Sequence, residues 1–156
     1  MPNFAFIDGQ NLHLGTAELG WSLNRRRFRT YLEEHYRVSH TYYFIGYIPD
    51  HRRLYTELRT AGYILVFKEV TYRGDGKPKG NVDAELVLQA MIEYPEYDRA
   101  VVATSDGDFA CLVRYLYEQG KLERVLSPHR KTCSALLKRA ARERIDFLEG
   151  ARRKIT

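Results

Sequence analysis

The stretch Arg99-Ala-Val-Val-Ala-Thr104-Ser-Asp-Gly-Asp-Phe109 joins an apolar, β-branched run to an acidic turn that contains a glycine. Residues 99–104 therefore predict a buried strand that ends directly before two aspartates, Asp106 and Asp108. A helix is predicted to follow and to end at Gly120. Its apolar residues recur at positions i, i+3, i+4 and i+7, and they are Phe109, Leu112, Val113 and Leu116.

The same pattern, a strand followed by an acid, stands at the start of the chain. Phe4-Ala-Phe-Ile7 is a short apolar run, and Asp8-Gly9 ends it. In an open α/β sheet, ligands bind outside the carboxyl ends of the strands, where the strand order reverses. If these two strands are neighbours, their three aspartates meet at that edge. Asp83 falls in the first turn of another predicted helix and can point towards the same edge.

The rest of the chain alternates between strand-like runs and helix-like periodicities. Further strands are predicted at 41–48, 63–67, 122–126 and 145–148, and further helices around 28–36, at 54–61, from about 81 to before Pro95, and at 134–143. Residues 71–80 hold three glycines and one proline and predict a long, mobile loop. This alternation favours an α/β fold in which helices cover both faces of a parallel sheet. We expect one domain over residues 1–156, with a basic helical segment from about residue 130.

Composition excludes several classes of protein. The 156 residues are 44% hydrophobic and 13% aromatic, which is enough for a packed core and argues against disorder. No apolar run approaches the ~20 residues of a membrane span, and the N-terminus does not resemble a signal peptide. Two cysteines, Cys111 and Cys133, are too few for a disulfide framework, so a reducing cytoplasm is the expected compartment. The net charge of +5 is concentrated after residue 120, which suits a polyanionic partner but also suits plain solubility.

Clustered carboxylates repel one another unless a cation or a shared proton offsets their charge. Mg²⁺ or Mn²⁺ is the natural cation, because both prefer oxygen ligands and keep several waters. Each residue also has a possible structural role. Asp83 and Asp106 could cap helices, Asp8 could stabilise a turn, and Asn11 could cap the start of a helix. The hydroxyls of Thr104 and Ser105 are candidates for the metal's waters or for turn stabilisation.

Three segments together resemble the motifs of the NYN domain family, a branch of the PIN-like nucleases. They are Phe6-Ile-Asp-Gly-Gln-Asn11, Lys79-Gly-Asn-Val-Asp83 and Val102-Ala-Thr-Ser-Asp-Gly-Asp-Phe109. The resemblance spans roughly residues 3–128. It implies a PIN-like three-layer sandwich whose parallel sheet has the order 3-2-1-4-5.

The resemblance also implies a site and an activity. Asp8, Asp83, Asp106 and Asp108 would be the acids that bind Mg²⁺ or Mn²⁺, and Asn11 their polar support in catalysis. The implied reaction is hydrolysis of a phosphodiester, most often in RNA, in which a metal-bound water attacks in line and leaves a 5′-phosphate. The chain departs from the family at Gln89, where members often carry a further acid.

Residues expected to contact substrate lie around this pocket, and they are Asn11, Tyr72, Arg73, Lys79, Thr104 and Ser105. In the segment before Asp83, the basic residues could bind a phosphate backbone and Tyr72 could stack on a base. A solvated loop without a binding role would have the same composition. RNA, or another nucleic acid, is the expected partner, no membrane is expected, and a homodimer stays open.

Two other classes of function compete with a nuclease. The first is a module on the same fold that binds nucleic acid or a protein without catalysis, which the missing acid at Gln89 favours. The second is a phosphohydrolase acting on a small ester, but a mechanism through aspartyl phosphate would need an aspartate where Gln10 stands. A receiver-type signalling domain also matches the alternation, but it is smaller and lacks the middle motif.

Overall fold

A computed structural model describes residues 1–69, 71–72, 74, 78–79 and 82–156. Its centre is a six-stranded sheet in which every neighbouring pair of strands is parallel. In spatial order the strands are β3 (Tyr63–Glu69), β2 (Val38–Tyr47), β1 (Asn3–Asp8), β6 (Ala100–Ala103), β7 (Leu122–Ser127) and β8 (Ile145–Phe147). The predicted order 3-2-1-4-5 is confirmed for the first five, and β8 adds a sixth strand at one edge.

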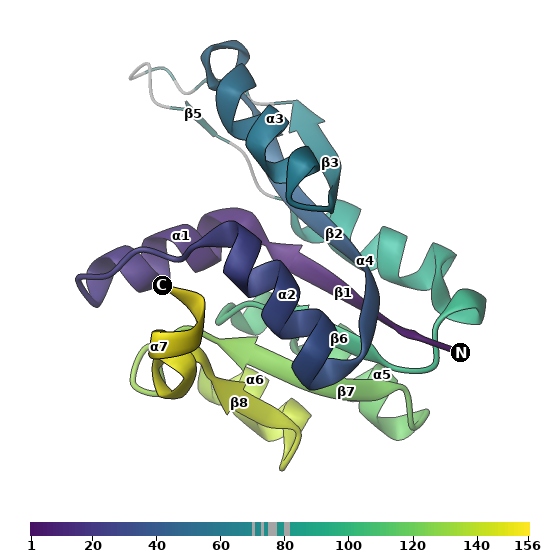
Figure 1. The fold of residues 1–156 in the computed structure, drawn as a ribbon. Helices are drawn as coiled ribbons and strands as arrows, with labels where there is room; N and C mark the ends of the chain where they lie inside the picture. The colour runs from purple at the N-terminus through teal and green to yellow at the C-terminus, as the bar shows by residue number, and fades with distance from the viewer. Residues whose placement is uncertain (70, 73, 75–77, 80–81) are drawn as a thin grey trace.

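Helices cover both faces of the sheet (Figure 1). One face carries α4 (Asp83–Ile92), α5 (Ala110–Glu118) and α6 (Ala135–Ala141). The other carries α1 (Gly9–Glu18), α2 (Arg25–Tyr36), α3 (Arg52–Thr60) and α7 (Arg152–Ile155). Short 3₁₀ turns, η1 to η4, lie at Pro49–His51, Tyr94–Glu96, Gly107–Phe109 and Leu148–Ala151.

Strand β1 shows why the apolar runs are continuous rather than alternating. Phe4 and Phe6 pack under the helices of one face, and Ala5 and Ile7 pack under the helices of the other. All four side chains are at most 5% exposed. A parallel strand covered on both faces must be apolar at every position, which is the pattern that the sequence shows.

Helix α1 was not predicted from the periodicity of the sequence. Only Gly9, Leu12 and Thr16 of its ten residues are buried, so its apolar stripe is too narrow to stand out in the sequence. Gly15 lies in its middle, where a Cβ would collide with the Pro128 ring. The glycine that weakens the helical pattern is therefore the residue that lets α1 pack closely.

The basic segment after residue 130 is packed into the fold. It contains β8 between α6 and α7, and Ile155 of α7 is fully buried against the α2 side of the sheet. The Ile155 carbonyl accepts a hydrogen bond of 2.8 Å from the Asn24 amide. The Tyr36 hydroxyl donates a 2.7 Å hydrogen bond to Asp146 in β8. Most of the segment's positive charge is therefore carried by ordered helix surface.

The predicted loop at 71–80 lies partly outside the described residues. Its described parts form a two-residue antiparallel ladder between β4 (Thr71–Tyr72) and β5 (Pro78–Lys79). No helix among the described residues is both long enough and apolar enough to cross a bilayer.

Candidate metal centre

The candidate site lies at the carboxyl ends of β1 and β6. These strands are neighbours, with Ile7 opposite Ala103, as the prediction required. From β1 the chain builds β2 and β3 on one side and then returns to β6 on the other. The strand order therefore reverses between β1 and β6, which is the position where open α/β sheets bind ligands.

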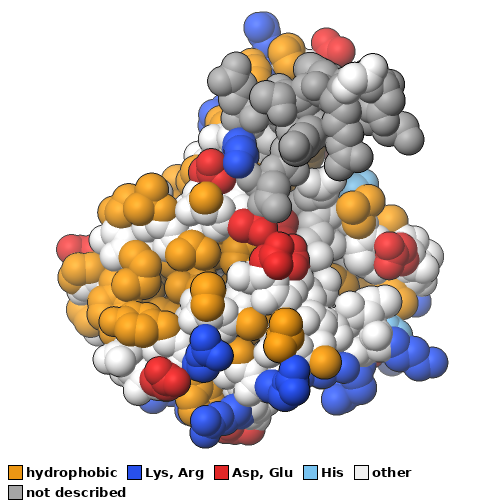
Figure 2. Space-filling model, turned by 180° about the vertical axis from the view of Figure 1, so that it is seen from behind, with side chains coloured by type: hydrophobic (Ala, Val, Ile, Leu, Met, Phe, Trp, Pro, Cys, Tyr) orange, Lys and Arg blue, Asp and Glu red, His pale blue; other side chains and the backbone are white. Residues whose placement is uncertain are grey.

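Three carboxylates converge at this edge. Asp83, Asp106 and Asp108 each offer an oxygen, and these oxygens all lie within 4.8 Å of one another. Figure 2 shows acidic side chains gathered near the centre of the face on which the site opens. Asp83 and Asp106 line a depression of about 180 Å³. Its other polar lining residues are Asp8, Gln10 and Asn11.

Capping and clustering turn out to be compatible roles for the same acids. Asp8 is the N-cap of α1 and accepts from the Asn11 amide at 3.4 Å, and Asp106 caps η3 by accepting from the Asp108 amide at 2.9 Å. At α4 the cap position belongs to Val82, and Asp83 is the first helical residue. The short loops thus hold the acids in place with their own backbone hydrogen bonds.

Asp8 lies deeper than the other three acids. It is only 6% exposed, and burial raises the pKa of its carboxyl to about 6 from an ordinary value of 3.8. Hydrogen bonds from Asn11 and Thr104 lower this pKa, while the negative charges of Asp83 and Asp106 raise it further. The site therefore disfavours the negative charge of Asp8 when no cation is close.

Thr104 connects the two strand ends. Its hydroxyl donates to a carboxylate oxygen of Asp8 at 3.1 Å and accepts from the Asp106 amide at 3.1 Å. Because Thr104 is fully buried, this hydroxyl positions the acids and has no path to a substrate. Ser105, the next residue, is held by the side chain of Asn11.

The turn that carries Asp106 and Asp108 is packed against the start of α6. The Ser134 amide donates to the Ser105 carbonyl at 3.1 Å. A Cβ on Gly107 would press against the Ser134 hydroxyl and would lie 3.1 Å from its Cβ. Glycine is therefore required between the two aspartates by close approach, not by an unusual φ.

The other residues predicted for the site lie apart from the cluster or outside the described part of the chain. Arg73 is not among the described residues, and of Tyr72 and Lys79 only the backbone positions in β4 and β5 are described. Gln89 donates at 3.0 Å to the carboxylate of Glu93, the C-cap residue of α4.

Glu85 does not take the place of the acidic residue that family members often carry at position 89. It forms a 3.7 Å salt bridge with Lys68 on β3. Among the described residues, the cluster of three acids gains no further carboxylate besides Asp8.

The donor set suits a hard divalent cation. It consists of carboxylate oxygens, and no described Lys or Arg forms a salt bridge with Asp8, Asp106 or Asp108. Oxygen ligands and incomplete neutralisation favour Mg²⁺ or Mn²⁺ over softer metals. Asp83, Asp106 and Asp108 are the residues whose oxygens could hold such an ion.

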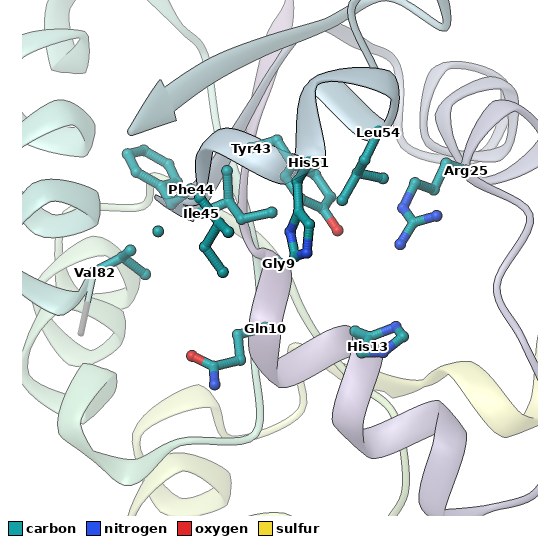
Figure 3. A pocket seen from close by; sticks show the side chains of 12 residues that line it. Gly9, Gln10, His13, Arg25, Tyr43, Phe44, Ile45, His51, Leu54 and Val82 are labelled. Atoms are coloured by element: carbon teal, nitrogen blue, oxygen red, sulfur yellow. The ribbon is translucent and has the colours of Figure 1, made fainter. Parts of the chain in front are cut away.

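A second depression adjoins the first and was missed by sequence reasoning. It has a volume of about 270 Å³ and shares the lining residues Gln10 and Val82 with the acidic depression. Figure 3 shows His13, Arg25 and His51 around it, on three different elements. The basic run that contains Arg25 is visible in the sequence, but nothing in the local sequence marks His13 or His51. Only the packing of α1, α2 and η1 at the sheet edge brings the three residues together.

A model of the NYN domain matches residues 4–149, almost the whole sheet and the entire candidate site. This chain belongs to the NYN domain family. The resemblance seen in the three motifs is thereby confirmed, and with it a PIN-like nuclease fold.

This NYN chain is also similar to individual proteins, of which one is a sequence relative and one a solved structure. The "Low amplitude and bright protein LabA" of Synechococcus elongatus (strain ATCC 33912 / PCC 7942 / FACHB-805) is 26% identical over 121 residues. That match covers 71% of this chain and 65% of LabA, slightly less than two thirds of its length. The crystal structure of a protein of unknown function from Vibrio parahaemolyticus RIMD 2210633 superposes with a TM-score of 0.72 at 24% identity. It covers 90% of both chains and supports the fold.

Proposed function

We propose that this chain is a metal-dependent nuclease that hydrolyses phosphodiester bonds in RNA. The observation that carries the proposal is the convergence of Asp83, Asp106 and Asp108 beside the buried Asp8 at the switch point of the sheet. The family supports it, because NYN proteins are generally nuclease-like and bind nucleic acid.

The three converging carboxylates would hold Mg²⁺ or Mn²⁺, and Asp8 would add negative charge from its buried position beside them. When bound, the cation would stabilise the charge that develops on the phosphoryl group and activate a water as the nucleophile. The chain's own part is to fix the acids before substrate arrives. Thr104 ties Asp8 to the Asp106 backbone, and Asn11 holds Ser105 directly before Asp106.

The nucleic acid would cross the carboxyl edge of the sheet. We assign Tyr72, Arg73 and Lys79, in the segment before Asp83, to contacts with its bases and phosphates. RNA rather than DNA is proposed from the family's usual partner, and matched DNA strands test it.

The decisive experiment is cleavage of end-labelled single-stranded RNA by wild type and Asp106→Asn in Mn²⁺, Mg²⁺ or EDTA. Glu118→Gln, which neutralises an exposed acid at the end of α5, is the matched control. We expect EDTA to abolish cleavage and Asp106→Asn to lower it about 100-fold or more, roughly 2.7 kcal/mol of transition-state stabilisation. Metal-dependent cleavage that persists unchanged in Asp106→Asn would refute the proposal.

A second candidate function is binding of nucleic acid without cleavage. It is favoured by Gln89, which stands where the family often has an acid and is engaged with Glu93. Salt-sensitive RNA binding with no cleavage in Mn²⁺ would establish it instead.

A further inference from the structure

The depression beside the acidic cluster has the features of a binding site. Its floor and walls are formed by Gly9 of α1 and by the end of β2, where Tyr43 and Phe44 are buried and Ile45 is half-buried. Leu54 of α3 closes one side. We call this depression, shown in Figure 3, the edge pocket.

Glycine at position 9 shapes the edge pocket. The Tyr43 ring lies directly against the Gly9 backbone, so a Cβ there would collide with the ring. Burial raises the pKa of the Tyr43 hydroxyl, and the neighbouring Arg25 guanidinium partly offsets the effect. The phenol therefore stays neutral and forms part of a mainly apolar wall.

The rim of the edge pocket carries nitrogen-bearing side chains. Arg25 begins α2, His13 lies on α1, and His51 precedes α3 with its ring directed towards α1 (Figure 3). None of the three forms a salt bridge with a described acid. An apolar interior under a rim of nitrogen donors suits a ligand with a flat apolar part and an anionic part.

The position and volume of the edge pocket restrict the kinds of ligand that it can bind. The edge pocket meets the acidic depression at Gln10 and Val82, so one extended ligand can occupy both. Pockets for drug-sized ligands measure about 300–1,000 Å³. At about 270 Å³, the edge pocket suits one small ring system rather than a larger group.

We propose that the edge pocket binds a single unstacked nucleobase of the nucleic acid whose phosphate lies at the acidic cluster. Arg25, His13 and His51 then contact the adjoining sugar-phosphate. The inference rests on the proposed function for the role of the acidic cluster. The proposal implies that the substrate is single-stranded, because a base within a duplex is stacked and paired and cannot enter a pocket.

The test is a binding measurement in EDTA, which is independent of cleavage. Fluorescence anisotropy would compare a labelled single-stranded RNA of ten nucleotides with the same strand annealed to its complement. The variant Arg25→Gln/His51→Ala removes two rim groups. The variant Arg26→Gln/His35→Ala removes the same chemistry from exposed positions on α2 and is the control.

We expect the rim variant to bind the single strand about tenfold or more weakly, and the control variant to stay within about twofold of wild type. Wild type should prefer the single strand to the duplex. A series of strands with one abasic nucleotide each should show one position at which wild type loses affinity. When the rim variant binds the strand that is abasic at that position, its affinity should be only slightly lower than for the intact strand.

The proposal is overturned if the rim and control variants bind alike, if wild type prefers the duplex, or if no abasic position matters. Absence of RNA binding by wild type would overturn it as well and would indicate another occupant, such as an apolar peptide. Cleavage by Asp106→Asn has no bearing on these outcomes, so failure of the nuclease proposal is distinguished from failure of this one.

Discussion

The Asn11 side chain clasps Ser105, 94 residues away in the sequence, with both ends of its amide. Its Oδ1 accepts from the Ser105 amide at 2.9 Å and from the hydroxyl at 3.1 Å, and its Nδ2 lies 2.9 Å from the same hydroxyl as a donor. The first motif is thereby locked to the third, immediately before Asp106. The asparagine that the family resemblance gives a supporting role acts here on protein rather than on a free ligand.

Asn11→Ala should loosen the acidic cluster. The substitution leaves the partly buried Ser105 amide without its partner, so we expect a loss of about 1–2 kcal/mol in the free energy of unfolding. Affinity for Mn²⁺ should fall about tenfold, since groups that orient metal ligands typically contribute 10–100-fold. Urea unfolding and calorimetric Mn²⁺ titration measure the two effects.

Ser105→Ala completes a double-mutant cycle with Asn11→Ala. The two losses should be strongly non-additive, because the residues act through one shared set of hydrogen bonds. Additive effects, or an Asn11→Ala protein with unchanged stability and Mn²⁺ affinity, would show that the clasp is incidental.

Asp8→Asn should stabilise the protein near pH 7.5 when no metal is present. The pKa of Asp8 is about 6 in the folded chain and about 3.8 when unfolded, so the folded state binds the proton more tightly. Stability therefore falls as pH rises from about 4 to about 6, and the whole loss is present at neutral pH. Removing the charge should recover about 1–3 kcal/mol, measured as a higher midpoint in urea.

The pH and metal dependence identify the cause of that gain. The advantage of Asp8→Asn should shrink as pH falls from about 6 to below 3.8, because the carboxyl is then protonated first in the folded state and finally in both states. It should also shrink in saturating Mn²⁺, where a cation offsets the charge. Glu118→Gln should change stability by less than about 0.5 kcal/mol. An Asp8→Asn protein that is less stable than wild type in EDTA at neutral pH would contradict the account.

Gly107→Ala should damage the acidic turn specifically. The new Cβ would press on Ser134, and the resulting shift of the turn should cost about 1–3 kcal/mol and weaken Mn²⁺ binding. Gly150→Ala is the control, because no atom lies within 4 Å of a Cβ placed there. Adding Ser134→Gly should restore most of the loss, and equal behaviour of the two alanine variants would exclude the steric explanation.

The sequence by itself predicted the strands of the parallel sheet, and the family resemblance implied the order of five of them. Strands β1 and β6 are buried on both faces, so their apolar runs are continuous. Strand β1 ends at Asp8, and Asp106 follows the end of β6 after Thr104 and Ser105, as the local pattern predicts. Helix ends were also readable, because Gly62 and Gly120 adopt positive φ values of 102° and 68°. Such features are predictable because they depend on a residue's own backbone and on burial with a regular period.

Tertiary structure alone decided the relationships between distant segments. The Asn11–Ser105 clasp, the buried bridge through Thr104 and the rim of the edge pocket all join residues far apart in sequence. Helix α1 belongs with them, since its packing depends on the close approach of Gly15 to Pro128. The physical reason is that a hydrogen bond or a pocket wall depends on which strands are neighbours and how closely helices pack, and no local periodicity records either.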